Sequence, residues 1–159
     1  MPFDVKRLSD CPELLETVGG WIYREWWQAT YSTPEPLLSR LAGHLQNDGI
    51  PLTLVAFEEN GDPVGSCCLI ESDCELRPQY SPWVAAVYVR PEYRHRGAAS
   101  ALLQEAAAVA GRLGIGGLYI DCWAATAPLY RQNGWRVLER DVGQRDSLVM
   151  YREIPPTQV

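Results

Sequence analysis

The sequence predicts a mixed α/β fold of six or seven strands and about four helices. Residues 84–122 carry the pattern of a β-α-β unit, because an apolar run, an amphipathic run and a second apolar run follow one another. Asn60-Gly61 lies between two apolar runs, which is a strong signal for a tight hairpin. Residues 135–140 and 147–152 are typical of two closing strands that pair as a second hairpin.

Length and composition indicate one folded domain. The chain has 159 residues, of which 47% are hydrophobic and 21% charged, as is ordinary for a globular protein. A chain of this length buries roughly two-thirds of the surface that it exposes when unfolded. We therefore expect a single domain over residues 1–154 and a frayed tail at 155–159.

Charge and hydropathy limit the partners of the protein. The net charge of -6 argues against a nucleic-acid partner, which needs a clustered basic face, and it suits a cationic substrate. No apolar run is long enough to cross a bilayer, and the N-terminus is unlike a signal peptide, so we expect no membrane partner and a cytoplasmic location. Homodimer formation is left open by the sequence.

The first half of the chain is expected to hold an edge strand, two helices and the hairpin. Ser9 or Asp10 is the predicted cap of the first helix, and Gly19-Gly20 is expected to break it, so that its second part leans over a site. These elements are predicted at residues 3–8, 12–30, 33–49, 52–59 and 63–72.

The central stretch is predicted to bind an anion. A strand at 84–89 leads into a basic turn of small residues, and a helix begins near Ala98 and ends at Gly114. Such a turn points free backbone N–H groups, at the positive end of a helix dipole, towards a ligand. Because arginines flank this turn, we expect a diphosphate at residues 94–100. A strand at 115–123 and a short helix at 125–135 follow.

The large aromatic residues have both a structural and a functional interpretation, whereas the cysteines have a structural one. Large aromatic residues crowd the first helix, and they can either pack in the core or form a substrate wall; they are Trp21, Tyr23, Trp26, Trp27 and Tyr31. The five cysteines lack C-x-x-C spacing and a neighbouring histidine pair, so we expect reduced, mostly buried thiols and no metal site.

Two motifs in the second half carry a family resemblance. Arg94, Gly97 and Ala99 match the pattern of Arg or Gln, two residues, Gly, one residue, and Gly or Ala. A second motif is matched further along, after the next predicted strand, by Ala127, Leu129, Tyr130, Gly134 and Trp135. In this order, the two motifs resemble those of the GNAT superfamily of acetyl-coenzyme-A-dependent N-acetyltransferases. The dinucleotide-fold alternative needs G-x-G-x-x-G, which the sequence lacks.

The resemblance implies a GNAT-like acyl-CoA N-acyltransferase fold, whose fourth and fifth strands splay apart, and acetyl-CoA as cosubstrate without a metal. The main chain of Val87, Tyr88 and Val89 would bind pantetheine like an added strand. The diphosphate would be held by the basic turn and the start of the helix, that is by Arg94, His95, Arg96, Gly97, Ala98, Ala99 and Ser100.

The sequence departs from the family pattern at three places. Ala99 replaces the commoner glycine, which leaves the diphosphate slightly less room. Ala124 stands where many members have an asparagine that contacts the cofactor. The strand 84–89 lacks the acidic residue that many members use as a base.

Direct acetyl transfer to an amine needs a proton acceptor and a proton donor. A lysine-like amine has a pKa of about 10.4, so its deprotonation at neutral pH costs about 4–5 kcal/mol. The resemblance places the phenol of Tyr130 beside the coenzyme sulfur as the donor. Asp73 is favoured as the base over Glu71 and Glu75, because its loop feeds the predicted cleft. Cys122 is interpreted as a packing residue.

We therefore predict an N-acetyltransferase that acts on a primary amine of a small molecule. The predicted pocket is shaped by Trp26, Trp27, Tyr31 and Trp83. Two alternatives stay open. A protein acetyltransferase acting on an N-terminus or a lysine would need an open groove, and an acyl-CoA-binding regulator would lack catalysis.

Overall fold

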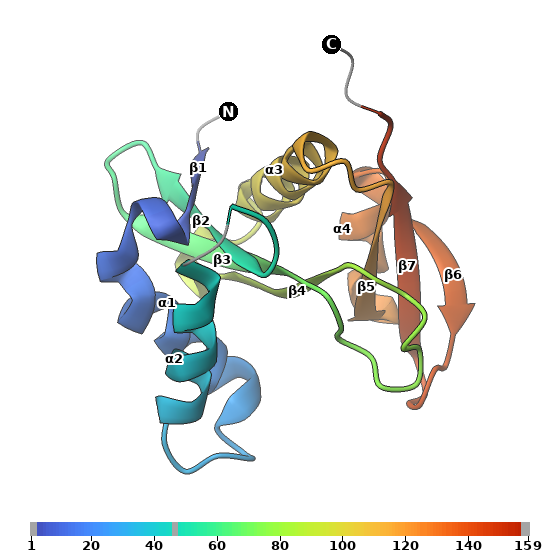
Figure 1. The fold of residues 1–159 in the computed structure, drawn as a ribbon, viewed down its shortest axis with the longest axis horizontal. Helices are drawn as coiled ribbons and strands as arrows, with labels where there is room; N and C mark the ends of the chain where they lie inside the picture. The colour runs from blue at the N-terminus through green and yellow to red at the C-terminus, as the bar shows by residue number, and fades with distance from the viewer. Residues whose placement is uncertain (1–2, 46–47, 157–159) are drawn as a thin grey trace. The chain divides into compact units, whose positions relative to one another are not determined.

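The computed structural model describes residues 3–45 and 48–156 of the chain. These residues form seven strands and four α-helices, and the strands lie in one mixed sheet in the order β1-β2-β3-β4-β5-β7-β6 (Figure 1). The predicted fold class is confirmed, and so is the edge position of the first strand. Asn47 and residues 157–159, where a helix end and part of the tail were predicted, lie outside the described residues.

The bounds of the elements follow the predicted order. The helices are α1 (Leu15–Ile22), α2 (Glu35–Ala42), α3 (Ala98–Arg112) and α4 (Ala127–Gln132). The strands are β1 (Phe3–Arg7), β2 (Leu52–Glu58), β3 (Pro63–Ile70), β4 (Trp83–Val89), β5 (Gly117–Trp123), β6 (Arg136–Arg140) and β7 (Ser147–Glu153).

The chain divides into two compact units. The first unit comprises Met1–Cys68 and Ala86–Leu102, and the second comprises Leu69–Ala85 and Leu103–Val159. The extent of the single predicted domain stays a prediction.

In the first unit, the aromatic helix departs from its predicted form. Two short 3₁₀ turns precede α1, which begins at Leu15 without a side-chain cap. The predicted break at Gly19-Gly20 is wrong, because α1 continues through both glycines and then widens into a π-helical turn at Tyr23–Trp27. A Cβ atom at Gly19 would overlap Leu38 of α2, so this glycine serves the close packing of α1 on α2, which lie side by side in Figure 1.

The predicted hairpin joins β2 and β3. Gly61 has a φ of +93°, and its N–H donates to Glu58 O at 2.9 Å. The Asn60 carboxamide oxygen accepts from the Asp62 N–H at 2.9 Å, which closes the turn locally. The turn residues therefore determine the hairpin without help from distant parts of the chain.

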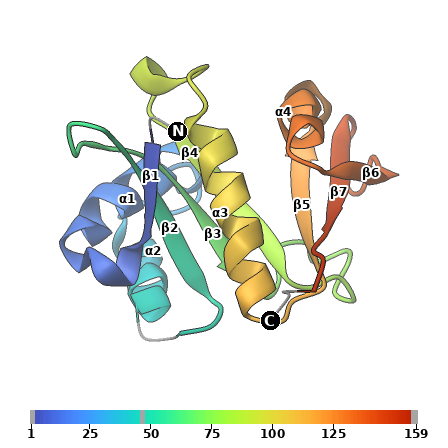
Figure 2. The ribbon, with the colours of Figure 1, turned by 90° about the horizontal axis from the view of Figure 1, so that it is seen from above.

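In the second unit, β5 pairs in parallel with β4 and antiparallel with β7, and β6 completes the sheet antiparallel to β7. The register between β4 and β5 is the pair Trp83↔Tyr119. Figures 1 and 2 both show α4 beside β5 and β7. The predicted β-α-β unit and closing hairpin are confirmed.

The five cysteines are reduced and form no disulfide, as predicted: Cys122 is half-buried and the other four are buried. Within residues 3–45 and 48–156, every helix is too short or too polar to cross a bilayer.

Replacement of Gly65 in β3 should destabilise the first unit. A Cβ atom at this position would lie 2.5 Å from the carbonyl oxygen of Tyr88 in β4, and a backbone atom cannot easily move away. We expect Gly65→Ala to lower the free energy of unfolding by about 1–3 kcal/mol in urea denaturation. Gly43→Ala is the matched control, since nothing lies within 4 Å of its Cβ position. An equal effect of both substitutions would contradict the close approach.

Candidate active site

The basic turn of the first unit has the geometry of an anion site. A 3₁₀ turn at Pro91–Tyr93 leads into His95 and Gly97, whose φ angles are +64° and +98°. Helix α3 begins directly afterwards, and Ala101 N–H donates to Gly97 O at 3.0 Å. The first N–H groups of a helix have no acceptor within it, and the helix dipole favours negative charge there. A Cβ atom at Gly97 would meet nothing within 4 Å, so the turn leaves room for a diphosphate.

Arg94 braces this turn against the end of β4. Its Nε donates to Val89 O at 2.7 Å, and its guanidinium lies 5.6 Å from the centre of the Tyr88 ring. Arg90 and Arg96 lie 5.2 and 5.7 Å from the Tyr93 ring. The arginines therefore combine positive charge with aromatic contacts that orient their side chains.

The strand that precedes the turn, β4, contains a residue with a positive φ angle. Ala86 has a φ of +53°, which is costly for a residue with a Cβ atom and was not foreseen from the sequence. The side chains of Val87 and Tyr88 are half-buried, and that of Val89 is buried. The proposed role of these three residues concerns their main chain, and this role stays a prediction.

The aromatic residues of the first unit separate into two groups. Trp21 stacks on Tyr88 with the ring centres 5.7 Å apart, and Trp26 meets the same ring edge-on at 6.4 Å. Trp26 is 48% exposed, so part of its ring faces solvent. Tyr88 therefore links the aromatic helix to Arg94.

The second aromatic group faces α2. Trp27 stacks on Tyr31 at 5.0 Å, and Arg40 of α2 lies 5.3 Å from the Trp27 ring. The Tyr23 hydroxyl donates to Tyr31 O at 2.6 Å. Trp27 and Tyr31 therefore form a stack of their own, apart from the Trp26–Tyr88 contact.

Trp83 does not line a pocket as the sequence suggested. Its side chain is fully buried, and its Nε1 donates to Tyr80 O at 2.7 Å. It packs in a cluster of the second unit with Cys74 and Val149. Trp83 is therefore a core residue, because an enclosed side chain cannot contact a substrate.

Tyr130 lies on α4 in the second unit. Its ring meets Trp135 edge-on at 6.1 Å, and 6% of its surface is exposed. Asn133 secures the end of α4, since its side chain donates to Leu129 O at 2.9 Å and accepts from Gln104 at 2.8 Å. The two motif positions Tyr130 and Trp135 are thus in contact.

Asp73 and Asp121 form a carboxylate pair in the second unit. Restricted hydration and the charge of Asp121 raise the pKa of Asp73 to about 6. Restricted hydration also raises the pKa of Asp121. Both residues keep exposed surface, so the pair can meet solvent or a ligand.

Asp121 was not predicted from the sequence as a site residue. The signal was a carboxylate in the apolar strand β5, two residues after Tyr119 and therefore on the same face. Glu71 and Glu75, the rival candidates for the base, are exposed carboxylates of the same loop, as Asp73 is; the raised pKa distinguishes Asp73.

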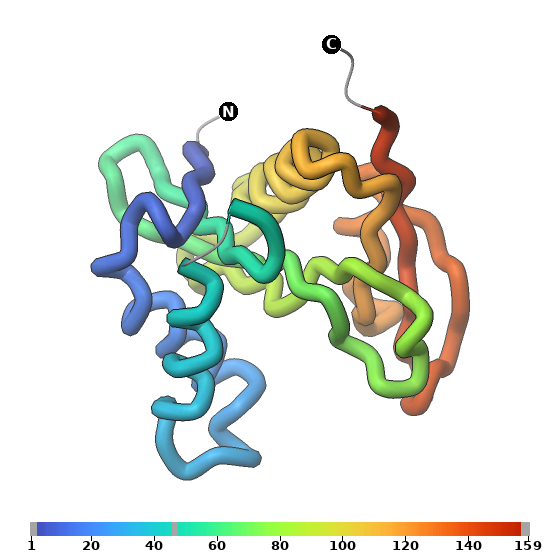
Figure 3. The backbone as a smooth tube through the Cα atoms, viewed as in Figure 1, coloured from blue at the N-terminus to red at the C-terminus, as the bar shows by residue number. Residues whose placement is uncertain are grey.

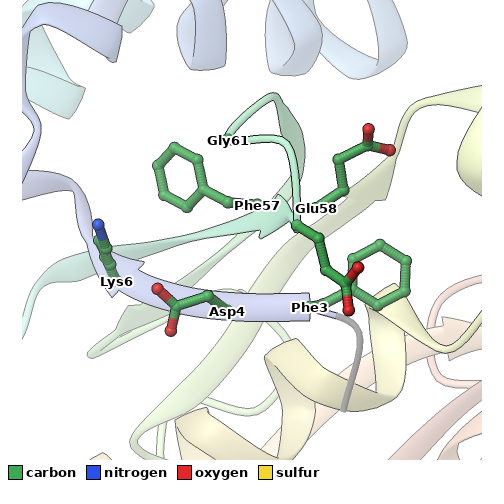
Figure 4. Close-up of a pocket in the computed structure, with 7 residues that line it drawn as sticks. Phe3, Asp4, Lys6, Phe57, Glu58 and Gly61 are labelled. Atoms are coloured by element: carbon green, nitrogen blue, oxygen red, sulfur yellow. The ribbon is translucent and has the colours of Figure 1, made fainter.

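An open cavity of about 410 Å³ lies elsewhere in the first unit, against β1 and the β2–β3 turn (Figure 4). Its lining combines two phenylalanines with charged side chains and is formed by Phe3, Asp4, Lys6, Phe57, Glu58, Glu59 and Gly61. It includes none of the predicted site residues.

Most of the chain matches the model of a known protein family. Residues 20–135 match the family model described as the acetyltransferase (GNAT) family. The chain belongs to this family. As a GNAT acetyltransferase it uses acetyl-CoA as cosubstrate, and the open N-terminal turn of α3 fits the diphosphate of that molecule. No curated protein sequence matches the chain.

Solved acetyltransferase structures share the GNAT fold of the chain. The spermidine N-acetyltransferase of Vibrio cholerae, in complex with CoA and spermine, is 18% identical; the match covers 96% of each chain with a TM-score of 0.72. An aminoglycoside 6'-N-acetyltransferase complexed with coenzyme A is 12% identical, with 98% and 99% of the chains covered and a TM-score of 0.71. A nourseothricin acetyltransferase is 26% identical over 69% of each chain, with a TM-score of 0.54.

Gly97→Glu should abolish binding of acetyl-CoA by this GNAT enzyme. The new carboxylate would lie at the turn that is expected to bind the diphosphate, and both groups are negative. We expect no measurable heat of binding in calorimetry.

Gly61→Glu is the control for that experiment, because Gly61 has a similar φ of +93° and equally open surroundings. This variant imposes the same backbone strain and should bind acetyl-CoA normally. Normal binding by Gly97→Glu would contradict the proposed diphosphate site.

Proposed function

We propose that this enzyme transfers the acetyl group of acetyl-CoA directly to a primary amine of a small cationic molecule. The observation that carries the proposal is the Asp73–Asp121 pair, which offers a carboxylate of unusually high pKa together with negative charge. A base with a pKa nearer to neutrality returns its proton to solvent readily and still accepts one from an amine.

The reaction conserves atoms and charge through three proton transfers. Asp73 accepts a proton from the ammonium group, directly or through water, and the amine nitrogen forms a bond to the acetyl carbon. The carbon–sulfur bond then breaks, and the leaving thiolate takes a proton from Tyr130. The acetylated nitrogen gives up its second proton, which restores the phenol of Tyr130, and Asp73 releases its own proton to solvent. The products are an N-acetylated amine, coenzyme A and one proton.

A covalent acetyl-cysteine intermediate is not needed for this reaction. Cys122 is the thiol nearest in sequence to Asp121, but burial raises its pKa, so it stays protonated at neutral pH. A protonated thiol is a poor nucleophile. Direct transfer is therefore the better supported route.

The coenzyme would be held by the first unit. The main chain of Val87, Tyr88 and Val89 would pair with pantetheine, and the turn from Arg94 to Ser100 would hold the diphosphate. The positive φ angles of His95 and Gly97 support this role, since alternating backbone conformations turn neighbouring N–H groups towards one anion.

The acceptor is proposed to be a small polycationic amine. The net charge of -6 and the two carboxylates favour a cation electrostatically, and the exposed part of Trp26 offers an aromatic surface. Similar structures are described as spermidine and aminoglycoside N-acetyltransferases, which supports this class. A cytoplasmic location and a homodimer stay predictions.

A screen of amines with acetyl-CoA, read by thiol release, tests the proposal. Polyamines and amino sugars should be acetylated, and lysine-containing peptides should not. Preferred turnover of peptides would favour the protein acetyltransferase instead. Acetyl-CoA binding without any thiol release would indicate a regulator.

Tyr130→Phe should lower kcat by about 10²–10⁴-fold if the phenol protonates the thiolate. The change removes one hydroxyl and keeps the ring contact with Trp135, so acetyl-CoA binding should persist. Tyr119→Phe is the matched control, since it removes a hydroxyl from another partly buried tyrosine of the second unit. An unchanged kcat for Tyr130→Phe would exclude the acid role.

Asp73→Asn should remove one step from the pH dependence of the reaction. In the wild type, kcat/KM for the amine should rise with pH through about 6, because only the ionised carboxylate accepts a proton. The asparagine variant should lose both this step and most of its activity. A wild-type profile without the step, or a fully active variant, would exclude Asp73 as the base.

The same substitution has an independent signature in stability. The pKa of Asp73 is raised on folding, so its ionisation disfavours the folded state as the pH rises from about 4 to about 6. Asp73→Asn should therefore raise the unfolding temperature at pH 7.5, and this gain should vanish below pH 4.

A further inference from the structure

Three residues of the second unit form a hydrogen-bonded cluster that the proposed reaction does not use. Arg77 binds Glu139 of β6 through two donors, Nε at 2.9 Å and Nη2 at 2.7 Å. The Tyr80 hydroxyl donates to the same carboxylate at 2.5 Å. Arg77 and Tyr80 together lower the pKa of Glu139 to about 2, so its negative charge persists throughout the physiological range.

This cluster attaches the second half of the loop between β3 and β4, residues 71–82, to β6 (the loop is green in Figure 3). Besides the bonds to β6, the Tyr80 ring stacks on Tyr119 of β5 with centres 4.5 Å apart and planes 5° apart. The main chain of the loop also meets β5, where Tyr119 N–H donates to Pro82 O at 3.1 Å. The loop is thus attached to the same strand face that carries Asp121.

Asp73 belongs to this loop, and no side-chain hydrogen bond of its own is seen among the residues that the structure describes. The position of Asp73 relative to Asp121 therefore depends on the rest of the loop, which Arg77 and Tyr80 attach to β6 and β5. The loop stacks through Tyr80 on Tyr119, which lies two residues before Asp121 on the same face of β5. The charge of Asp121 also contributes to the raised pKa of Asp73.

We propose that Arg77, Glu139 and Tyr80 are positioning residues for the amine site, because their cluster keeps Asp73 within electrostatic reach of Asp121. This inference rests on the proposed function of Asp73. The three residues contact neither the amine nor acetyl-CoA; they act through the conformation of the loop. Release of the loop admits water to Asp73 and separates it from Asp121.

Glu139→Gln and Tyr80→Phe test the proposal. The first variant removes the charge that Arg77 binds, and the second removes one hydroxyl while it keeps the ring that stacks on Tyr119. Because small displacements of a catalytic group are costly, we expect kcat/KM for the amine to fall roughly 10- to 100-fold. The dissociation constant for acetyl-CoA should stay unchanged.

The pH profile separates positioning from a purely structural role. Asp73 faces Asp121 from β5 and is flanked in its own loop by Glu71, Glu75 and Arg77. When the loop is released, better hydration should move the midpoint of the acid limb from about 6 to a lower pH. A loss of folded protein would lower the rate at every pH and leave this midpoint in place.

Glu105→Gln is the matched control, since it breaks the 2.9 Å ion pair with Arg112 on α3, also in the second unit, without a bond to the loop. It should have wild-type activity and an unmoved midpoint. Wild-type activity of Glu139→Gln, or a reduced rate with an unmoved midpoint, would overturn the proposal. If Glu139→Gln fails to fold, the same criteria apply to Tyr80→Phe.

The proposed function and the positioning role predict different experimental failures. A wild-type enzyme that acetylates no amine would overturn the proposed function. An active wild type whose Asp73→Asn variant is inactive, but whose cluster variants behave like the wild type, would overturn only the positioning role.

Discussion

The main chain of β4 is the constraint on which the rest of the structure depends. Gly65 allows its neighbour β3 to approach closely, because a Cβ atom there would lie 2.5 Å from Tyr88 O, and Arg90 N–H extends the contact with a 2.8 Å bond to Val64 O. The Nε of Arg94 donates a hydrogen bond to Val89 O, which holds the turn against the end of the strand. At its other end, Trp83 sets the register with Tyr119. In the first unit the basic turn thus follows the end of β4, and in the second unit the start of β4 pairs with β5.

The charges of the second unit are divided between two roles. Glu139 is paired with an arginine and a phenol, and this pairing lowers its pKa. Restricted hydration instead raises the pKa of Asp73 and that of Asp121. A fold that only optimised stability would pair or remove these two carboxylates. Two carboxylates with raised pKa values are compatible with the proposed binding of a cationic amine.

Local signals explain why much of the fold was predictable. The Asn60-Gly61 turn, the amphipathic run of α3 and the glycine at its end act through neighbours in the sequence. Where the sequence misled, a distant contact decided the outcome. Gly19-Gly20 looks like a helix break, yet Gly19 faces Leu38 and permits helix packing. The sequence suggests that Trp83 lines a pocket, yet its side chain is buried in a cluster with Cys74 and Val149, which are distant in sequence.

In the candidate site, too, some features follow from the local sequence and others from contacts between distant residues. The sequence was enough to predict the family and the cosubstrate, because both predictions depend on short motifs whose geometry is local. The binding of a diphosphate by residues 94–100 follows from the same motifs and stays a prediction. Only the tertiary structure separated Trp26 from Trp27 and revealed Asp121 as the neighbour of Asp73. It also joined Arg77 and Tyr80 to Glu139, about 60 positions further along the chain. Side chains so far apart in sequence meet only through the pairing of strands, and no local pattern encodes that meeting.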